Sequence, residues 1–297
     1  MCPSPSCPDI STRLAPARHL RDTACLFTES FPRKRENPMS DTVQVERRDD
    51  IAIVSLHRTE KRNALRQEDW IAVGDTIDAL GEDDDLRCVV LRGAGEEAFC
   101  AGADITNFEA ERSDRKKVKT YEAATDRAFL SVRNSHHPVI AMIHGFCIGG
   151  GFELALAADL RISGESGRFG VPAKNIGLFL GYNLVQLLVD AGGRAVASEI
   201  LLEGRAISAE EALIKNLVTR VVPDVELEEN VMKAARRIAD GAPLSHRFHR
   251  AALQRLADPR PLTRAELEGQ FDYADSEDYM AGYNAFKARE KPKFRGR

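Results

Sequence analysis

Residues 137–163 read HPVIAMIHGFCIGGGFELALAADLRIS, and this stretch decides the fold. Its first nine residues are typical of a buried strand, and ADLRIS at its end predicts a second, short strand. The apolar helix between them opens on three glycines, Gly149 to Gly151, and carries Glu153 in its first turn. Glycine costs a helix about 1 kcal/mol relative to alanine, and a buried carboxylate is costly unless something uses it. Two departures from local rules within five residues indicate a functional site.

The same arrangement, a buried strand followed by a glycine-rich loop and a polar position, occurs twice more. The segments are VVLRGAGEEAFCAGADI (89–105) and LRISGESGRFGVPAKNIGL (160–178). Unpaired N–H groups at a helix N-terminus, together with the helix dipole, attract negative charge. With a second free N–H from the AGAD loop, two donors would converge on one oxygen and form an oxyanion hole. Glycines that only permit tight helix–strand packing are the alternative reading.

Strands alternate with helices along the rest of the chain, which predicts an α/β core with mostly parallel strands. Residues 97–105 are expected to form a loop, and residues 112–134 a charged helix with a thin apolar edge. A helix over 181–204 should break at Gly192–Gly193. After residue 225 the pattern is helical throughout, over 225–240, 245–257 and roughly 263–290.

The chain divides into three predicted segments. Residues 1–38 hold six of the 13 prolines without the apolar region of a secretory signal, which indicates a disordered extension or a mis-assigned start. Residues 39–240 form the expected core, and residues 241–297 a helical C-terminal region.

Composition excludes several functional classes. With a net charge of −4 and no apolar run near the ~18 residues that span a bilayer, the sequence favours a soluble protein without nucleic-acid or membrane partners. The six cysteines form no C-x-x-C pair, and no histidine stands at metal-ligand spacing. We therefore expect no metal site, and reduced thiols in a cytoplasmic protein.

Five segments in order resemble the signatures of the crotonase (enoyl-CoA hydratase/isomerase) superfamily. They are SLHRTEKRNAL (55–65), AFCAGADI (98–105), the stretch at 137–163, FGVP (169–172) and ISAEEALIKNLVTRVV (207–222). The similarity extends over about 43–297. It implies a crotonase-type spiral of ββα units with a helical C-terminal region that trimerises, as a homotrimer or a hexamer. It also implies an acyl-CoA substrate and no cofactor, since coenzyme A is part of the substrate.

The resemblance assigns roles to individual positions. The backbone N–H groups of Ala103 and Gly150 match the family's oxyanion hole, and Glu153 matches the first of the two catalytic glutamates in its hydratases. Further positions correspond to the coenzyme A contacts of the family: Arg58, Lys61, Ala64, Ala101, Asp104, Ile105 and Lys291.

The chain departs from the hydratase pattern where the second glutamate belongs, because Pro172 is followed by Ala173. The resemblance thus predicts a hydratase that adds water to a 2-enoyl-CoA with one glutamate. The segment LGYNL (180–184) is also similar to methylmalonyl-CoA decarboxylases of the superfamily, in which Tyr182 would orient the leaving carboxylate. A catalytically silent acyl-CoA binder is the third interpretation.

Overall fold

The computed structural model describes residues 41–297. The predicted extension or mis-assigned start at 1–38 lies outside these residues. The described residues belong to one compact unit, and the division at residue 240 into a core and a C-terminal region stays a prediction.

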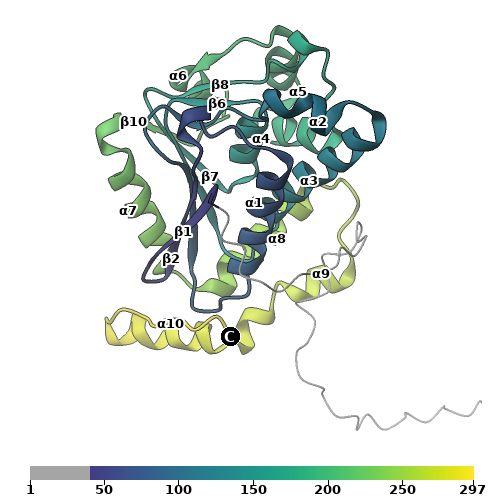
Figure 1. Cartoon of the computed structure of the whole chain (residues 1–297). Coiled ribbons are helices and arrows are strands. Elements are labelled where there is room, and N and C mark those ends of the chain that lie inside the picture. Colours follow the sequence, from purple (N-terminus) through teal and green to yellow (C-terminus); the bar gives the residue numbers. More distant parts are fainter. Residues whose placement is uncertain (1–40) are drawn as a thin grey trace, which may run out of the picture. The chain divides into compact units, whose positions relative to one another are not determined.

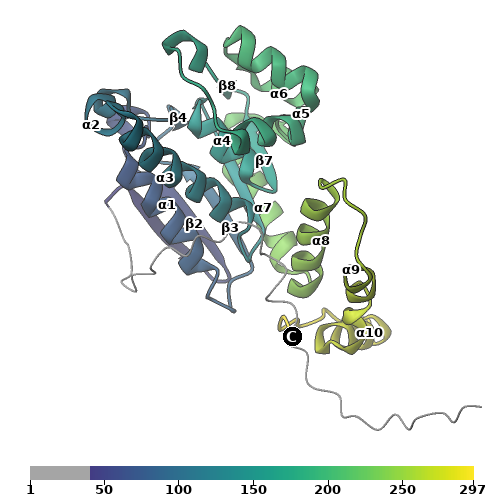
Figure 2. The ribbon, with the colours of Figure 1, turned by 90° about the vertical axis from the view of Figure 1, so that its right-hand side faces the viewer.

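The strands form two sheets (Figures 1 and 2). The larger sheet has the order β1-β2-β3-β5-β7-β10, and all of its pairs are parallel except β1–β2. Its strands are β1 (Val43–Arg48), β2 (Ile51–Leu56), β3 (Cys88–Gly93), β5 (Val139–Ile143), β7 (Leu160–Gly164) and β10 (Arg220–Val222). The smaller sheet has the order β4-β6-β8-β9 and consists of β4 (Ala98–Cys100), β6 (Phe146–Ile148), β8 (Arg168–Gly170) and β9 (Ile207–Ser208).

Helices connect and cover the sheets. The α-helices are α1 (Gln67–Leu80), α2 (Phe108–Arg112), α3 (Arg115–Arg133), α4 (Gly150–Ala157), α5 (Tyr182–Glu203), α6 (Ala209–Ile214), α7 (Leu227–Ala239), α8 (Pro243–Leu256), α9 (Arg264–Gly269) and α10 (Glu277–Ala288). Short 3₁₀ turns are η2 (Thr59–Lys61), η3 (Ile105–Asn107), η4 (Ala173–Ile176), η5 (Asp224–Glu226) and η6 (Asp272–Asp275).

The chain repeats one ββα step. Strand β3 of the larger sheet leads to β4 of the smaller sheet and then to α3, and β5, β6 and α4 follow in the same order. Strands β7 and β8 precede η4 and α5. Because neighbouring strands from successive steps pair in parallel, each step needs a crossover connection. The predicted spiral of ββα units is confirmed.

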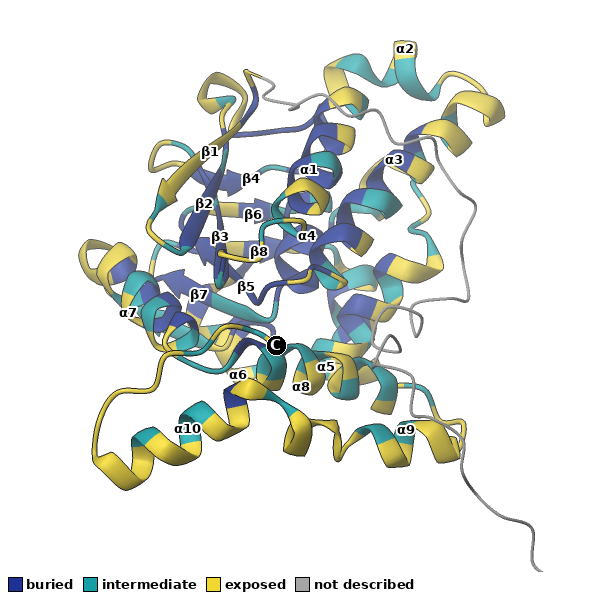
Figure 3. Cartoon of the chain, turned by 90° about the horizontal axis from the view of Figure 1, so that it is seen from below, coloured by how far each residue is buried: buried dark blue, intermediate teal, exposed yellow. Residues whose placement is uncertain are grey.

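The central strands are buried on both faces, since alternate residues belong to different cores. In β2, Ile51 and Ile53 pack with α7, whereas Ala52 and Val54 face the opposite side. That opposite core includes residues of α1, α3 and α4. Figure 3 shows the central strands β2, β3 and β5 and the inner faces of these helices as buried. The larger sheet is therefore a middle layer between α7 and the other three helices.

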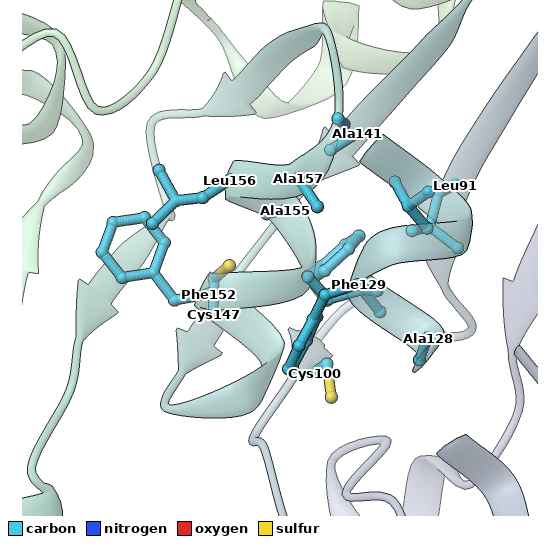
Figure 4. Close-up of a cluster of buried hydrophobic side chains, with 14 of the residues drawn as sticks. Leu91, Cys100, Ala128, Phe129, Ala141, Cys147, Phe152, Ala155, Leu156 and Ala157 are labelled. Carbon is cyan, nitrogen blue, oxygen red and sulfur yellow. The ribbon is translucent and has the colours of Figure 1, made fainter. Parts of the chain in front are cut away.

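Helix α4 lies inside this second core. From Gly151 to Ala157 each of its residues is buried, which is typical of a helix surrounded by protein. Figure 4 shows Ala155 and Ala157 of α4 near Phe129 of α3 and Leu91 of β3. Packing on all sides fixes the position of the α4 N-terminus.

Two expectations from the sequence were wrong. Residues 98–100, expected as loop, form β4, because strands of two or three residues are too short to show a period in the sequence. The single helix expected over 263–290 is interrupted by η6, and Ser276 caps α10 by accepting a hydrogen bond from the N–H of Tyr279 (3.1 Å). The break at Gly192–Gly193 is confirmed, since Gly193 has a φ of 76°.

Arg250 makes several of the hydrogen bonds that join helix α8 to the core. Arg250 Nε donates to both carboxylate oxygens of Asp159 at 2.8 Å, and its guanidinium also donates to the carbonyl oxygens of Arg133 and Ser135. Asp159 follows α4 directly and accepts from the N–H of Val139 at 2.7 Å. The start of the helical C-terminal region is thus connected to the end of α4.

We predict that Gly151→Ala destabilises the protein by about 1–3 kcal/mol, because a Cβ at this position would lie 2.2 Å from the carbonyl oxygen of Cys100. Urea denaturation measures the change. Gly181→Ala is the matched control, since a Cβ at that position meets open space and φ is −63°. Equal stability of the two variants would contradict the close contact between α4 and β4.

Candidate active site

The first hydrogen-bond donor of the site lies at the start of α4. Gly149 precedes the helix with φ 54° and ψ −128°, a conformation that favours glycine. Its own N–H is bonded to the carbonyl oxygen of Gly170 at 2.8 Å. The N–H of Gly150, the first helical residue, has no acceptor within the helix. This N–H group therefore carries part of the positive charge that the helix dipole places at the N-terminus.

The second donor comes from the loop after β4. Leu65 and Ala103 form an isolated parallel bridge, in which the N–H groups of Leu65 and Asp104 make the hydrogen bonds. Among the hydrogen bonds of residues 41–297, none uses the N–H of Ala103. The loop touches α4, because a Cβ on Gly102 would lie 3.2 Å from the nitrogen of Gly150. Two N–H groups from different steps of the spiral are therefore neighbours.

A buried aromatic pair lies against Gly150. A Cβ on Gly150 would lie 3.0 Å from the ring of Trp70. Trp70 Nε1 donates a hydrogen bond to the hydroxyl of Tyr121 at 2.8 Å. That hydroxyl in turn donates to the carbonyl oxygen of Leu65 at 3.4 Å. Both rings are fully buried. The pair links α1 and α3 to the α4 N-terminus and to the strand segment that bridges Ala103.

Glu153 is a buried carboxyl group with an unused oxygen. Glu153 is 1% exposed, and its Oε1 has no hydrogen-bond partner among the described residues. The pKa of Glu153 is raised to about 8, first by burial and then by the nearby carboxylate of Glu122, with a smaller effect of Asp126. The guanidinium of Arg112 acts in the opposite direction. Such a group can exchange a proton near neutral pH.

Arg112 of α2 and two acids of α3, Glu122 and Asp126, act on this carboxyl, and Asn183 of α5 is hydrogen-bonded to Asp126. Arg112 Nη1 forms an ion pair with Glu122 Oε1 at 3.3 Å. Asn183 Nδ2 donates to Asp126 Oδ2 at 3.1 Å, while Asp126 Oδ1 is buried and has no hydrogen-bond partner within residues 41–297. Burial raises the pKa of both acids. The charge of Arg112 partly offsets the rise for Glu122, and the hydrogen bond from Asn183 partly offsets it for Asp126.

The sequence pattern did not single out these four residues. A charged helix such as 112–134 normally exposes its charges, and Asn183 is an ordinary residue in the first turn of a helix. The available signal was the spacing of Glu122 and Asp126, four residues apart and each next to a buried residue of the apolar edge, Tyr121 or Thr125.

Arg58, one of the expected coenzyme A contacts, is bonded through its guanidinium to two others, Ala64 and Asp104. Its Nη1 donates to the carbonyl oxygen of Ala64 at 2.6 Å, and its Nη2 pairs with Asp104 at 3.0 Å. Burial works against ionisation of Asp104, but hydrogen bonds from Thr106 and Arg58 hold its pKa below the ordinary value. These contacts fasten the loop that carries Ala103, and the N–H of Ala101 is bonded to the carbonyl oxygen of Arg62.

The other expected residues are exposed. Lys61 ends η2, and Ile105 is 65% exposed at the start of η3. Tyr182 is 96% exposed in the first turn of α5. The Lys291 side chain is 92% exposed, and its Nζ lies 3.9 Å from Asp240. Lys291 follows α10, which lies apart from α4 (Figures 1 and 2), so one protomer does not bring it to Glu153. The roles of these residues stay predictions.

Residue 173 is a half-buried alanine at the start of η4, so this position supplies no second carboxyl group. Within residues 41–297, no three His, Cys, Asp or Glu side chains are arranged to hold a metal ion. In the same range, no helix has the length and apolar character needed to cross a membrane.

Comparisons with known proteins identify the family to which this chain is similar. Residues 46–297 match the family model described as enoyl-CoA hydratase/isomerase. The chain is 35% identical to the (E)-benzylidenesuccinyl-CoA hydratase of Thauera aromatica (83% of this chain, 96% of the relative) and 31% identical to the short-chain-enoyl-CoA hydratase of Clostridium acetobutylicum (84% and 96%). A solved enoyl-CoA hydratase/carnithine racemase from Magnetospirillum magneticum is 41% identical with a TM-score of 0.85 (87% and 97% covered).

We predict that Glu153→Gln stabilises the protein, and more at pH 8 than at pH 5. The folded state holds a proton on Glu153 up to about pH 8, whereas the unfolded state releases it near the ordinary carboxyl pKa. Stability therefore falls as pH rises between the two values, by on the order of 2–4 kcal/mol, and glutamine removes this loss. Denaturation curves at both pH values measure it.

The exposed Glu210 of α6 provides the control, because Glu210→Gln removes a carboxylate from the surface. A stability difference between Glu153→Gln and the parent protein that is the same at pH 5 and pH 8 would contradict the raised pKa.

Proposed function

The chain belongs to the enoyl-CoA hydratase/isomerase family, and we propose that it adds water to the double bond of a 2-enoyl-CoA thioester. The observation that carries the proposal is Glu153, a buried carboxyl in the first turn of the helix whose Gly150 N–H is one of two neighbouring donors. The hydratase names of the relatives support the same reaction class.

The N–H groups of Ala103 and Gly150 would bind the thioester oxygen. Addition of water at Cβ moves the π electrons toward that oxygen and creates an enolate. Hydrogen bonds placed where this charge develops stabilise the transition state, and loss of one such donor typically costs roughly 3–4 kcal/mol. The donors come from backbone atoms packed against Trp70 and β4, so they need little rearrangement when the substrate binds.

Glu153 would be the acid–base residue. Its carboxylate takes a proton from water while the water oxygen bonds to Cβ, and the carboxylic acid then returns a proton to Cα. One group suffices when both additions occur on the same face of the double bond. Because Ala173 cannot assist, we propose a hydratase with one glutamate. Its rate would lack the roughly 10²–10⁴-fold contribution of a second acid–base group.

Decarboxylation of an acyl-CoA is the second candidate. The raised pKa keeps Glu153 mostly protonated at pH 7, and a proton donor without a second base suits an enolate formed by loss of carbon dioxide. Against this candidate, Tyr182, which would orient the leaving carboxylate, is 96% exposed. We therefore favour hydration.

We further propose that the protein acts in the cytoplasm as a homotrimer or a dimer of trimers. The C-terminal helices expose large apolar side chains, as expected of a surface that another subunit covers; these are Leu253, Leu256, Leu267, Phe271, Tyr283 and Phe286. A groove of about 360 Å³ on α5 is lined by further apolar residues: Val185, Val189, Ala197, Leu201 and Leu202. In such an assembly Lys291 would approach coenzyme A on a neighbouring subunit.

We predict that the purified protein hydrates crotonyl-CoA and that Glu153→Gln lowers kcat at least 10²-fold, because the amide cannot take a proton from water. Loss of absorbance of the conjugated thioester measures the rate. Glu210→Gln should retain the parent rate. If the parent protein binds crotonyl-CoA without turnover, hydration is wrong, and methylmalonyl-CoA decides between decarboxylation and silent binding.

The pH dependence separates the two reactions. Hydration needs ionised Glu153, so kcat/KM for crotonyl-CoA should rise with pH and level off above about 8. Decarboxylation that uses protonated Glu153 as the donor should instead decline above that pH. A hydration profile that is flat from pH 5 to 9 would show that Glu153 does not limit the reaction.

A further inference from the structure

Arg112, at the end of α2, is a buried cation. Its side chain is only 9% exposed. The guanidinium carbon lies 3.9 Å from the ring centre of Tyr121 and 4.8 Å from that of Phe108. Arginine is rarely buried to this extent without full hydrogen bonding, because its charge must leave water.

The hydrogen-bonding capacity of Arg112 is only partly used. Within the described chain, Nε and Nη1 have no hydrogen-bond acceptor. Nη1 is 3.3 Å from Glu122 Oε1, an ion pair that lacks hydrogen-bond geometry. A buried donor without an acceptor destabilises the folded state, because it has lost its hydrogen bonds to water. Two unused donors on one guanidinium therefore leave hydrogen bonds free for an acceptor from outside the chain, either water or a ligand.

Contacts place Arg112 beside the acyl end of the site. Tyr121, on which it stacks, is hydrogen-bonded to Trp70, and the Trp70 ring lies against Gly150. Arg112 also interacts electrostatically with Glu153. A thioester held at Gly150 with its double bond near Glu153 would direct the rest of its acyl chain toward this polar group.

A plain hydrocarbon chain fits these surroundings poorly. Besides the two donors of Arg112, Asp126 Oδ1 and Glu153 Oε1 are buried without hydrogen-bond partners in the part of the chain that the structure describes. A hydrocarbon would displace water from these atoms without replacing its hydrogen bonds. An oxygen atom on the acyl chain would instead accept from Arg112.

The charges favour a neutral oxygen over a carboxylate. Glu122 forms an ion pair with Arg112, and Glu153 also interacts with Arg112 and is itself influenced by the nearby Asp126. This polar group therefore already contains three acids. A substrate carboxylate would add a fourth negative group to a buried site, where like charges are costly. A hydroxyl or carbonyl oxygen accepts the same hydrogen bonds without that charge.

Building on the proposed hydration, we propose that Arg112 selects acyl chains with a neutral, hydrogen-bond-accepting oxygen beyond the double bond. The preferred substrates are then hydroxy- or oxo-substituted enoyl-CoA thioesters rather than plain hydrocarbon ones.

Two substrates of equal chain size test the proposal: 6-hydroxyhex-2-enoyl-CoA and hept-2-enoyl-CoA, which differ by a hydroxyl in place of a methyl. We expect kcat/KM to be roughly tenfold or more higher for the hydroxy substrate, because the hydrocarbon leaves buried polar groups unpaired. Hex-2-enedioyl-CoA, with a terminal carboxylate, tests the charge argument and should be the poorest of the three.

Variants test the role of Arg112. Arg112→Leu should abolish or invert the preference, and Arg112→Lys, which keeps the charge and most of the stem, should retain part of it. Arg115→Leu is the control, since Arg115 is exposed at the start of α3, and it should keep the parental ratio. The ratio of the two substrates cancels a general loss of activity or folded protein.

Calorimetric affinities of the saturated analogues, 6-hydroxyhexanoyl-CoA and heptanoyl-CoA, give a readout that does not depend on turnover. If no enoyl-CoA is hydrated but the hydroxy analogue binds more tightly through Arg112, hydration is wrong and the selectivity stands. A ratio of one or less in the parent protein, an unchanged ratio in Arg112→Leu, or a preference for the dioate overturns the selectivity.

Discussion

The site depends on the close approach of α4 to β4 and to the loop that follows β4. A Cβ on Gly151 would lie 2.2 Å from the Cys100 carbonyl oxygen, and one on Gly102 would lie 2.7 Å from that of Ile148. Only glycine permits such contact, and the contact brings the N–H groups of Ala103 and Gly150 together. The main role of the glycines at 149–151 is thus to allow this backbone conformation and close packing. Because these donors belong to backbone atoms fixed by the two sheets, side-chain motion does not disturb them.

Glu153 shows how the same packing creates reactivity at a cost in stability. The helix that carries it is buried from Gly151 to Ala157, so its carboxyl cannot be solvated as a surface acid is. Nearby carboxyl groups on α3 add to the effect, and among the described residues Arg112 opposes it. A site arranged for folding alone would place an apolar side chain here. The protein retains an acid whose proton is exchangeable near neutral pH, which is typical of a functional group rather than a structural one.

Much of the fold could be predicted from the sequence, and the reasons are local. The central strands of the larger sheet are apolar on both faces, and the glycines at 149–151 and 192–193 mark a helix start and a helix break. The smaller sheet could not be predicted, because strands of two or three residues have no measurable period. The donors and Glu153 could be assigned from motifs, whereas Arg112, Glu122 and Asp126 could not. Their burial arises when α2, α3 and α5 meet, and this contact leaves no pattern in a helix rich in charged residues.

The repeating ββα step also places the backbone N–H donors and the variable acid side chains on different steps of the spiral. Ala103 follows the β3–β4 step and Gly150 the β5–β6 step, whereas residue 173 and Asn183 follow the β7–β8 step. Substitutions after β8 can therefore alter the available acid groups without moving the proposed donors for the thioester oxygen. Under the proposed function, the reaction could change in evolution one step of the spiral at a time, while the backbone that binds the thioester oxygen stays the same.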